Sequence, residues 1–188
     1  MLQIYLFGPL RLLYQGQPLK FAALPKTLPL FADLLLHRAK PLPRTTLAFT
    51  HWPDVSEAEA RSNLRRHLYE LRRVLPKAPE EQPWLLVDNN TVQWNSAAAY
   101  WCDVAAFEEA GARVAQWTEA VQLYTGDLLP ELYEDWIFLE RERLRNHFFD
   151  RLSHLMTHAS AAQDHLTAIR YAQQLLHHDP YAKMSCGN

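Results

Sequence analysis

The sequence predicts a mainly α-helical protein with a small β component, in which a helix-turn-helix module is followed by an all-α module. The charge divides unequally, since residues 1–77 hold 12 Lys and Arg against 5 Asp and Glu, whereas residues 78–188 hold 7 against 16. After residue 103 the apolar residues recur at helical spacing and glycine is nearly absent. We therefore expect two domains with different partners, at 1–96 and 97–188.

The composition is that of a folded protein, with 48% hydrophobic residues, six Trp, eight Tyr and eight Phe among 188 residues. Only Cys102 and Cys186 are present, too few for a disulfide scaffold or a thiolate metal site. The N-terminus lacks the pattern of a signal peptide, and no apolar stretch is long enough to span a membrane. We expect a cytoplasmic protein with no membrane partner.

Residues 56–75, SEAEARSNLRRHLYELRRVL, organise the first domain as one amphipathic helix. The hydroxyl of Ser56 can cap the helix while Glu59, three residues later, reaches back to the backbone of Ser56. An apolar stripe recurs at steps of three and four residues and comprises Ala60, Leu64, Leu68, Leu71 and Leu75.

The other positions of this helix are expected to face water or a partner. They are Arg61, Ser62, Asn63, Arg65, Arg66, His67, Tyr69, Glu70, Arg72 and Arg73. Five guanidinium groups stand against one carboxylate, and they repel one another unless a polyanion accepts them. Nucleic acid is the obvious candidate, and a solvated arginine-rich face on a packed helix is the competing interpretation of this stretch alone.

The flanking segments predict the remaining elements of a helix-turn-helix. Residues 2–21 alternate as a small antiparallel sheet, and a helix of about ten residues begins near Thr27 or Pro29. A short helix capped by Thr45 or Thr46 then follows, ending before Pro53. Its expected apolar side comprises Leu47, Phe49 and Trp52. Only a few residues separate it from the arginine-rich helix, and WLLVDNNTVQW predicts a closing hairpin.

This order of elements, with TTLAFTHWPD before SEAEARSNLRRHLYELRRVL, resembles the OmpR-type winged helix at the N-terminus of SARP-type and AfsR-type bacterial transcriptional activators. The resemblance implies that the third helix enters the major groove of double-stranded DNA and that the hairpin touches the neighbouring minor groove or backbone. It places near base edges Ser62, Asn63, Arg66, His67 and either Glu70 or Tyr69. It gives phosphate contacts to Arg61, Arg65 and Arg73.

The second domain is expected to be helical throughout and to stack like tetratricopeptide repeats. Its apolar positions predict two short helices, the first with Val104, Phe107 and Ala110 or Val114, the second with Trp117, Val121 and Tyr124. A long helix from about 134 to 159 and a last helix from about 164 to 178 follow. The apolar side of the last helix comprises Leu166, Ile169, Tyr171 and Leu175.

Three stretches of this domain, WCDVAAFEEA, GDLLPELYEDWIFLERERLR and DHLTAIRYAQQLLHHDP, resemble the bacterial transcriptional activator domain of the same regulators. The resemblance implies homo-oligomerisation on DNA and signal transmission, with RNA polymerase as a further candidate partner. A repeat array needs a further helix over its last face, and YAKMSCGN at 181–188 does not resemble one. Either the domain is truncated at its C-terminus or it closes by pairing with another copy.

No constellation of residues predicts catalysis, a metal site or a cofactor. His147 and His154 lie two helical turns apart, about 10 Å along the axis, so with His158 they fit a helix interface better than a metal site. Phosphate-cradling, nucleophile-elbow and metalloprotease motifs are absent from the sequence. An enzyme is not expected.

Two hypotheses therefore follow from the sequence. The leading one is a sequence-specific regulator of transcription that binds double-stranded DNA. The alternative is a tetratricopeptide-like interaction scaffold whose winged helix docks on protein. The acidic second half and the DNNT turn, which holds no Arg or Lys, favour this alternative.

Overall fold

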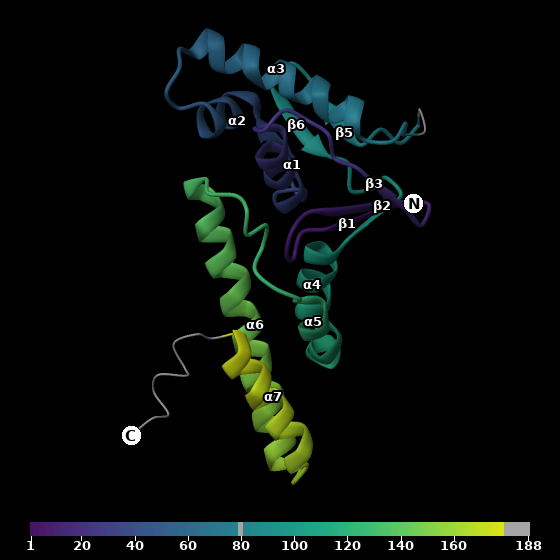
Figure 1. Ribbon diagram of the computed structural model, residues 1–188, viewed down its shortest axis with the longest axis vertical. Coiled ribbons are helices and arrows are strands. Elements are labelled where there is room, and N and C mark those ends of the chain that lie inside the picture. The colour runs from purple at the N-terminus through teal and green to yellow at the C-terminus, as the bar shows by residue number, and fades with distance from the viewer. Residues whose placement is uncertain (79–80, 179–188) are drawn as a thin grey trace. The chain divides into compact units, whose positions relative to one another are not determined.

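The computed structural model describes residues 1–78 and 81–178. It is mainly helical with two small sheets, which confirms the predicted mainly α composition with a small β component (Figure 1). Contacts divide the chain into a first unit of residues 1–6 and 10–102 and a second unit of residues 7–9 and 103 onward. Among the described residues, no helix is both long enough and apolar enough to cross a membrane.

The first sheet has the strand order β3-β2-β1-β7. Its strands are β1 Leu2–Tyr5, β2 Arg11–Tyr14, β3 Gln17–Leu19 and β7 Tyr100–Cys102. The first three are antiparallel, as predicted, and the turn from β2 to β3 places Gln15 and Gly16 at φ values of 53° and 80°. Strand β7, which pairs in parallel with β1, is not predictable from the sequence, because three residues are too few to show an alternating pattern.

Three helices and a hairpin complete the first unit. They are α1 Thr27–Leu36, α2 Arg44–His51, α3 Glu57–Val74, β5 Leu85–Val87 and β6 Thr91–Trp94, with the two-residue β4 Leu42–Pro43 pairing with β6. Helix α3 packs against α1 and α2, and α1 also packs against β6. Phe31 and Trp94 are fully buried with their rings 5.5 Å apart, so they anchor α1 to the hairpin.

The predictions for α1, α3 and the hairpin are confirmed, whereas two details of α2 are wrong. The helix begins at Arg44, with Pro43 in the capping position and no side-chain cap, rather than after Thr45 or Thr46. Phe49 was expected on the apolar side, but 47% of it is exposed. The buried positions of α2 are Leu47, Ala48 and His51. These three lie one step or one turn apart, which is why they share one face.

The second unit is helical. It comprises α4 Asp103–Gly111, the 3-10 turn η1 Val114–Gln116, α5 Trp117–Leu123, α6 Asp135–Ala161 and α7 His165–His178. Helix α4 packs against α5, and α6 packs against both α5 and α7. Aromatic side chains fill the core, where the rings of Tyr124 and Phe148 stack at 4.3 Å. Phe7 also belongs to this unit, and its backbone N–H donates to Asp103 Oδ2 at 3.0 Å.

The positions of the two long helices agree with the sequence, but the expected apolar face of α7 is buried only in part, since Tyr171 and Leu175 are half-buried. Leu166 is 83% exposed and Ile169 is 55% exposed, whereas Ala168 is buried. Of the alternatives on α4, Ala110 is buried and Val114, beyond the helix, is 71% exposed. The expectation about residues 181–188 lies outside the described residues.

Candidate nucleic-acid interface

The start of α3 is held by the predicted capping box. The Glu59 backbone N–H donates to Ser56 Oγ, and the Ser56 backbone N–H donates to Glu59 Oε2 at 3.1 Å. The Ser56 hydroxyl also donates to this carboxylate, and these hydrogen bonds lower the pKa of Glu59. The capping box satisfies two of the backbone donors at the helix start and so stabilises the first turn.

The opposite faces of α3 differ as the sequence predicts. The apolar stripe is buried, with exposed fractions of 0% to 4% at Ala60, Leu64, Leu68, Leu71 and Leu75. Ser62, Arg66, Tyr69 and Arg73 lie on the far side from this stripe and are exposed. Asn63 and Glu70 lie at its edge and are half-buried.

Two of the five arginines on α3 have acidic partners within the helix. Arg61 pairs with Glu57 at 2.5 Å, and Arg73 pairs with Glu70 at 2.8 Å. Within residues 1–78 and 81–178, Arg65, Arg66 and Arg72 form no ion pair. The exposed face of α3 therefore carries an excess of positive charge that these residues leave uncompensated.

The turn of the hairpin, residues 88–90, lies beside the N-terminal half of α3. Together with Arg44, Arg61 and Arg65 it lines a pocket of about 470 Å³. The Arg44 backbone N–H donates to the Asn90 carbonyl at 2.8 Å, and its guanidinium lies 3.4 Å from the Asp88 carbonyl oxygen. Arg44 thus supplies a cation next to a turn that has none of its own.

Arg44 is not among the residues expected from the sequence to contact DNA, although a continuous positive face of residues 56–75 with Lys26, Arg38 and Arg44 was expected to favour DNA binding over the scaffold. The sequence does indicate that Arg44 lies at the start of a helix, since Arg44 directly follows Pro43 and proline is common at helix starts. Only the pairing of β4 with β6 shows that this helix start lies under the hairpin turn.

Asp88 gives this turn a defined shape. Its Oδ1 accepts from the backbone N–H groups of Asn90 and Thr91 at 2.6 Å, and its Oδ2 accepts from the Thr91 hydroxyl at 2.8 Å. These hydrogen bonds lower the pKa of the Asp88 carboxyl group. The turn is therefore built around an engaged carboxylate, with Asn89 at its tip.

His67 was predicted to face outward, and this prediction is wrong. The residue is only 7% exposed. Its Nδ1 lies 2.8 Å from the hydroxyl oxygen of Thr27 on α1, and its ring lies 5.0 Å from that of Trp52. Burial lowers the pKa of His67, and the nearby positive charge of Arg66 lowers it further. His67 directly precedes Leu68 and lies one turn before Leu71, which places it on the buried side of α3.

A second polar cluster connects α1 with α2. The buried carboxylate of Asp33 contacts His51 Nε2 at 2.9 Å and His37 Nδ1 at 2.8 Å. Burial by itself raises the pKa of Asp33, but the hydrogen bonds from His37 and His51 outweigh it, and the pKa is lowered. The three helices that present the basic face are thus joined by polar contacts as well as by apolar packing.

The titratable side chains elsewhere in the described part of the chain do not form a metal site. No group of three or more His, Cys, Asp or Glu residues could hold a metal ion there. His154 and His158 line a separate hollow in the second unit.

Comparison with known proteins gives two similarities. Residues 102–187 match the family model of the bacterial transcriptional activator domain. A solved structure of Mycobacterium tuberculosis EmbR in complex with a low-affinity phosphopeptide has a similar fold, with a TM-score of 0.58 and 20% sequence identity. The match covers 93% of this chain and 53% of that one, so this chain spans about half the length of its relative. A comparison with curated proteins gave no match.

Proposed function

We propose that this chain is a SARP-type transcriptional regulator that binds double-stranded DNA sequence-specifically through its first unit. The match of residues 102–187 to the bacterial transcriptional activator domain and the fold shared with EmbR support this proposal. The observation that carries the proposal is the exposed face of α3. Arg65, Arg66 and Arg72 lie there without ion pairs among the described residues, and Arg44 lies close by. Such an excess of charge fits a polyanionic backbone.

In this proposal, α1 to α3 and the hairpin β5–β6 form a winged helix-turn-helix (Figure 1). Helix α3 has 18 residues and is therefore roughly 27 Å long. The major groove is about 12 Å wide and admits an α-helix. The N-terminal half of α3 enters the groove, while the apolar stripe keeps the helix attached to its own core.

The side chains divide into two roles by their position around α3. Ser62, Arg66 and Tyr69 face directly outward and lie nearest the base edges, where an arginine suits a guanine. Arg61 and Arg65 lie on the edge nearest the hairpin turn and, with Arg44, bind phosphates. Arg73 is a further phosphate contact near the helix end. Asn63 and Glu70 lie at the margin, and His67 positions α3 from beneath.

We assign DNA binding to the domain at 1–96 and a tetratricopeptide-like activator domain to 97–188. The helix pairs α4 with α5 and α6 with α7 support this architecture. The activator domain serves self-association on DNA or signal transmission, with RNA polymerase as a further partner. The site of action is the cytoplasm, and the function is regulatory rather than enzymatic.

The direct test is the salt dependence of duplex binding, measured by fluorescence anisotropy with a random-sequence duplex of 20 base pairs. Neutralising four to six phosphates gives a log-log slope of about −4 to −5. Replacing Arg65 and Arg66 together with Ala should reduce the magnitude of this slope by about 1, because Arg65 is assigned to a phosphate and Arg66 to a base edge. Arg113→Ala, an exposed arginine of the second unit, is the matched control and should leave the slope unchanged. A wild-type chain without salt-dependent duplex binding overturns the proposal.

A protein-interaction scaffold is the second candidate, favoured by the exposed Leu166 and Ile169 on α7. Apolar side chains exposed one turn apart are typical of protein contacts. Under this alternative, duplex binding is absent and the Arg65 and Arg66 substitutions change nothing in the anisotropy titration. The same experiment therefore separates the two functions.

A further inference from the structure

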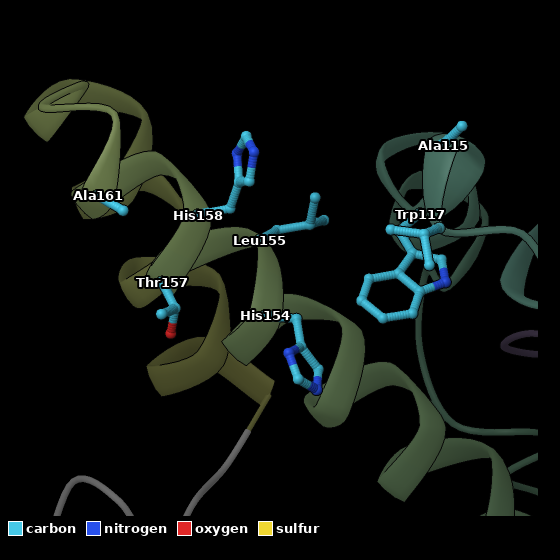
Figure 2. A pocket seen from close by; sticks show the side chains of 8 residues that line it. Ala115, Trp117, His154, Leu155, Thr157, His158 and Ala161 are labelled. Atoms are coloured by element: carbon cyan, nitrogen blue, oxygen red, sulfur yellow. The ribbon is translucent and has the colours of Figure 1, made fainter.

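The second unit contains a hollow of about 610 Å³ between α6 and the segment formed by η1 and the start of α5 (Figure 2). Its walls are formed chiefly by Trp117, Leu155, His154 and His158, with Val114 at the edge. Ligand pockets in proteins typically measure about 300 to 1,000 Å³ and are mostly apolar with a few well-placed polar groups. The hollow agrees with this description in size and in its apolar lining, and it is open to solvent, since six of its eight lining residues are exposed.

Its aromatic wall is held in place before any ligand arrives. The Trp117 Nε1–H donates to the Gly111 carbonyl oxygen at 2.9 Å, which fixes the orientation of the indole. The ring of His154 lies 5.3 Å from that of Trp117, with an interplanar angle of 46°. Trp117 and Leu155 are only half-buried, so part of their apolar surface is left uncovered by the described chain.

The polar character of the hollow comes from two imidazoles. His154 and His158 are four residues apart on α6, and both are exposed. The Thr157 hydroxyl is already used, because it donates to the Ser153 carbonyl oxygen at 2.9 Å. None of the eight lining residues carries a carboxylate. An imidazole can donate a hydrogen bond through its ring N–H, so the hollow suits an anionic group that accepts one.

We propose that this hollow binds a small planar aromatic molecule that carries a carboxylate or sulfonate group. The aromatic ring lies against Trp117 and Leu155, where aromatic surfaces gain from offset or tilted packing. The anionic group accepts a hydrogen bond from either His154 or His158 at the rim, since the two imidazoles point away from each other in Figure 2. This site is separate from the arginine-rich face of α3, and its occupancy does not depend on DNA binding.

Isothermal titration calorimetry of the full chain with 1-naphthoate, and with the uncharged analogue 1-naphthamide, tests the proposal. Naphthoate is expected to bind saturably to one site. Ala161→Phe places a ring in the hollow and should abolish this binding, whereas Ala162→Phe, at the adjacent residue that does not line it, should not. Ala115→Phe fills the hollow from the opposite wall and serves as a second blocking variant. Circular dichroism confirms that each variant is folded.

The anion preference is tested with His154→Gln combined with His158→Gln. Naphthoate binding should weaken roughly tenfold, as expected for a lost hydrogen bond to a charged group, with naphthamide binding little changed. His165→Gln, an exposed histidine of α7 outside the hollow, is the control. Equal losses for both ligands overturn the assignment of the anion.

Binding that survives both blocking variants, or no saturable binding to the wild type, overturns the site. In another outcome, the wild-type chain fails to bind naphthoate while a blocking variant changes the mass measured by analytical ultracentrifugation. This combination shows instead that the hollow receives another copy of the protein. That result also overturns the proposal. Because duplex binding is measured separately, failure of the ligand site is distinguishable from failure of the DNA-binding function.

Discussion

The Nδ1 atom of His67 on α3 lies 2.8 Å from the hydroxyl oxygen of Thr27 on α1. His67 is 7% exposed and Thr27 is fully buried, so water cannot replace either partner. Trp52 packs against the imidazole ring. Together with the buried apolar stripe, this contact helps to fix the rotation of α3 about its axis and thereby which arginines face outward.

Replacing His67 with Ala should destabilise the first unit by about 1 to 3 kcal/mol, because the Thr27 hydroxyl loses its buried partner and a cavity forms. Urea denaturation of the full chain measures this loss. Duplex affinity should fall equally for specific and random sequences, since α3 is displaced as a whole. A variant with wild-type stability but altered base preference would show that His67 reads bases directly.

The stability of the first unit should also depend on pH through His67. Burial lowers its pKa below the ordinary value of 6.5, so the unfolded chain binds a proton at higher pH than the folded chain does. The contribution of His67 to the stability of the first unit is therefore complete above pH 6.5 and is lost as the pH falls below that value. Urea midpoints of wild type and His67→Gln, compared between pH 8 and pH 5, should converge at the acidic end. Parallel curves for the two proteins would contradict the prediction.

Asp33 does not confound this measurement, because it changes the stability of the first unit in a different pH range. The hydrogen bonds from His37 and His51 outweigh the opposing effect of burial and hold the pKa of Asp33 below 3.8. The stability that this carboxylate contributes is present above pH 3.8 and is lost only as the pH falls through its lower folded pKa. His37 and His51 are shared by wild type and variant, so the difference between the two curves reports His67.

The sequence alone predicts the start and the buried side of α3 most accurately, because several local signals coincide there. The capping box at Ser56 and Glu59 marks the start, and the apolar stripe marks the buried side. The turn at Asp88 is likewise defined by neighbours in sequence. Where propensity, capping and periodicity agree, local interactions determine the structure and tertiary contacts change it little.

The features that the sequence does not predict depend on contacts between distant residues. His67 lies at the edge of the stripe, and its burial depends on Thr27, 40 residues earlier. Arg44 reaches the candidate interface only through the pairing of β4 with β6. The helical spacing that includes Leu166 is compatible with burial, yet the described chain leaves Leu166 exposed. A periodic pattern shows which residues share a face, but not which face another element covers.

Arg65 and Arg66 are neighbours in sequence but are expected to differ in function. Arg66 faces directly away from the buried stripe, so Arg66→Ala should relax base preference at one position at a cost of about 1 to 3 kcal/mol in specific binding. Arg65 lies beside the hairpin turn, so Arg65→Ala should weaken all sequences alike and reduce the magnitude of the salt slope by about 1. Selection of bound duplexes from a random pool, followed by anisotropy titrations, measures both effects.

Arg73→Ala is the comparison variant for this pair. Arg73 donates two hydrogen bonds to Glu70, so its charge is partly compensated before DNA arrives. Its removal should weaken binding less than removal of Arg65, without altering base preference. Equal effects of Arg65→Ala and Arg66→Ala on specific and random duplexes would contradict the division of roles.

Arg141 holds together the loop that precedes α6. Its guanidinium donates to the carbonyl oxygens of Leu128, Leu129 and Leu132, and the residue is only 8% exposed. Arg141→Met retains much of the apolar stem but leaves three carbonyl groups without their donor. We expect a loss of roughly 2 to 4 kcal/mol in the stability of the second unit.

Arg141→Lys discriminates between charge and geometry at this site. A lysine keeps the positive charge, but its compact ammonium group cannot match the planar fork that contacts three carbonyl groups. The stability of this variant, measured by urea denaturation, should therefore lie between that of Arg141→Met and that of the wild type. Arg113→Met, at an exposed position of the same unit, should leave the midpoint unchanged. Because Arg141 belongs to the second unit and α3 to the first, duplex affinity at low denaturant should persist in Arg141→Lys. A lysine variant as stable as the wild type would show that charge alone, rather than the three-carbonyl geometry, holds the loop.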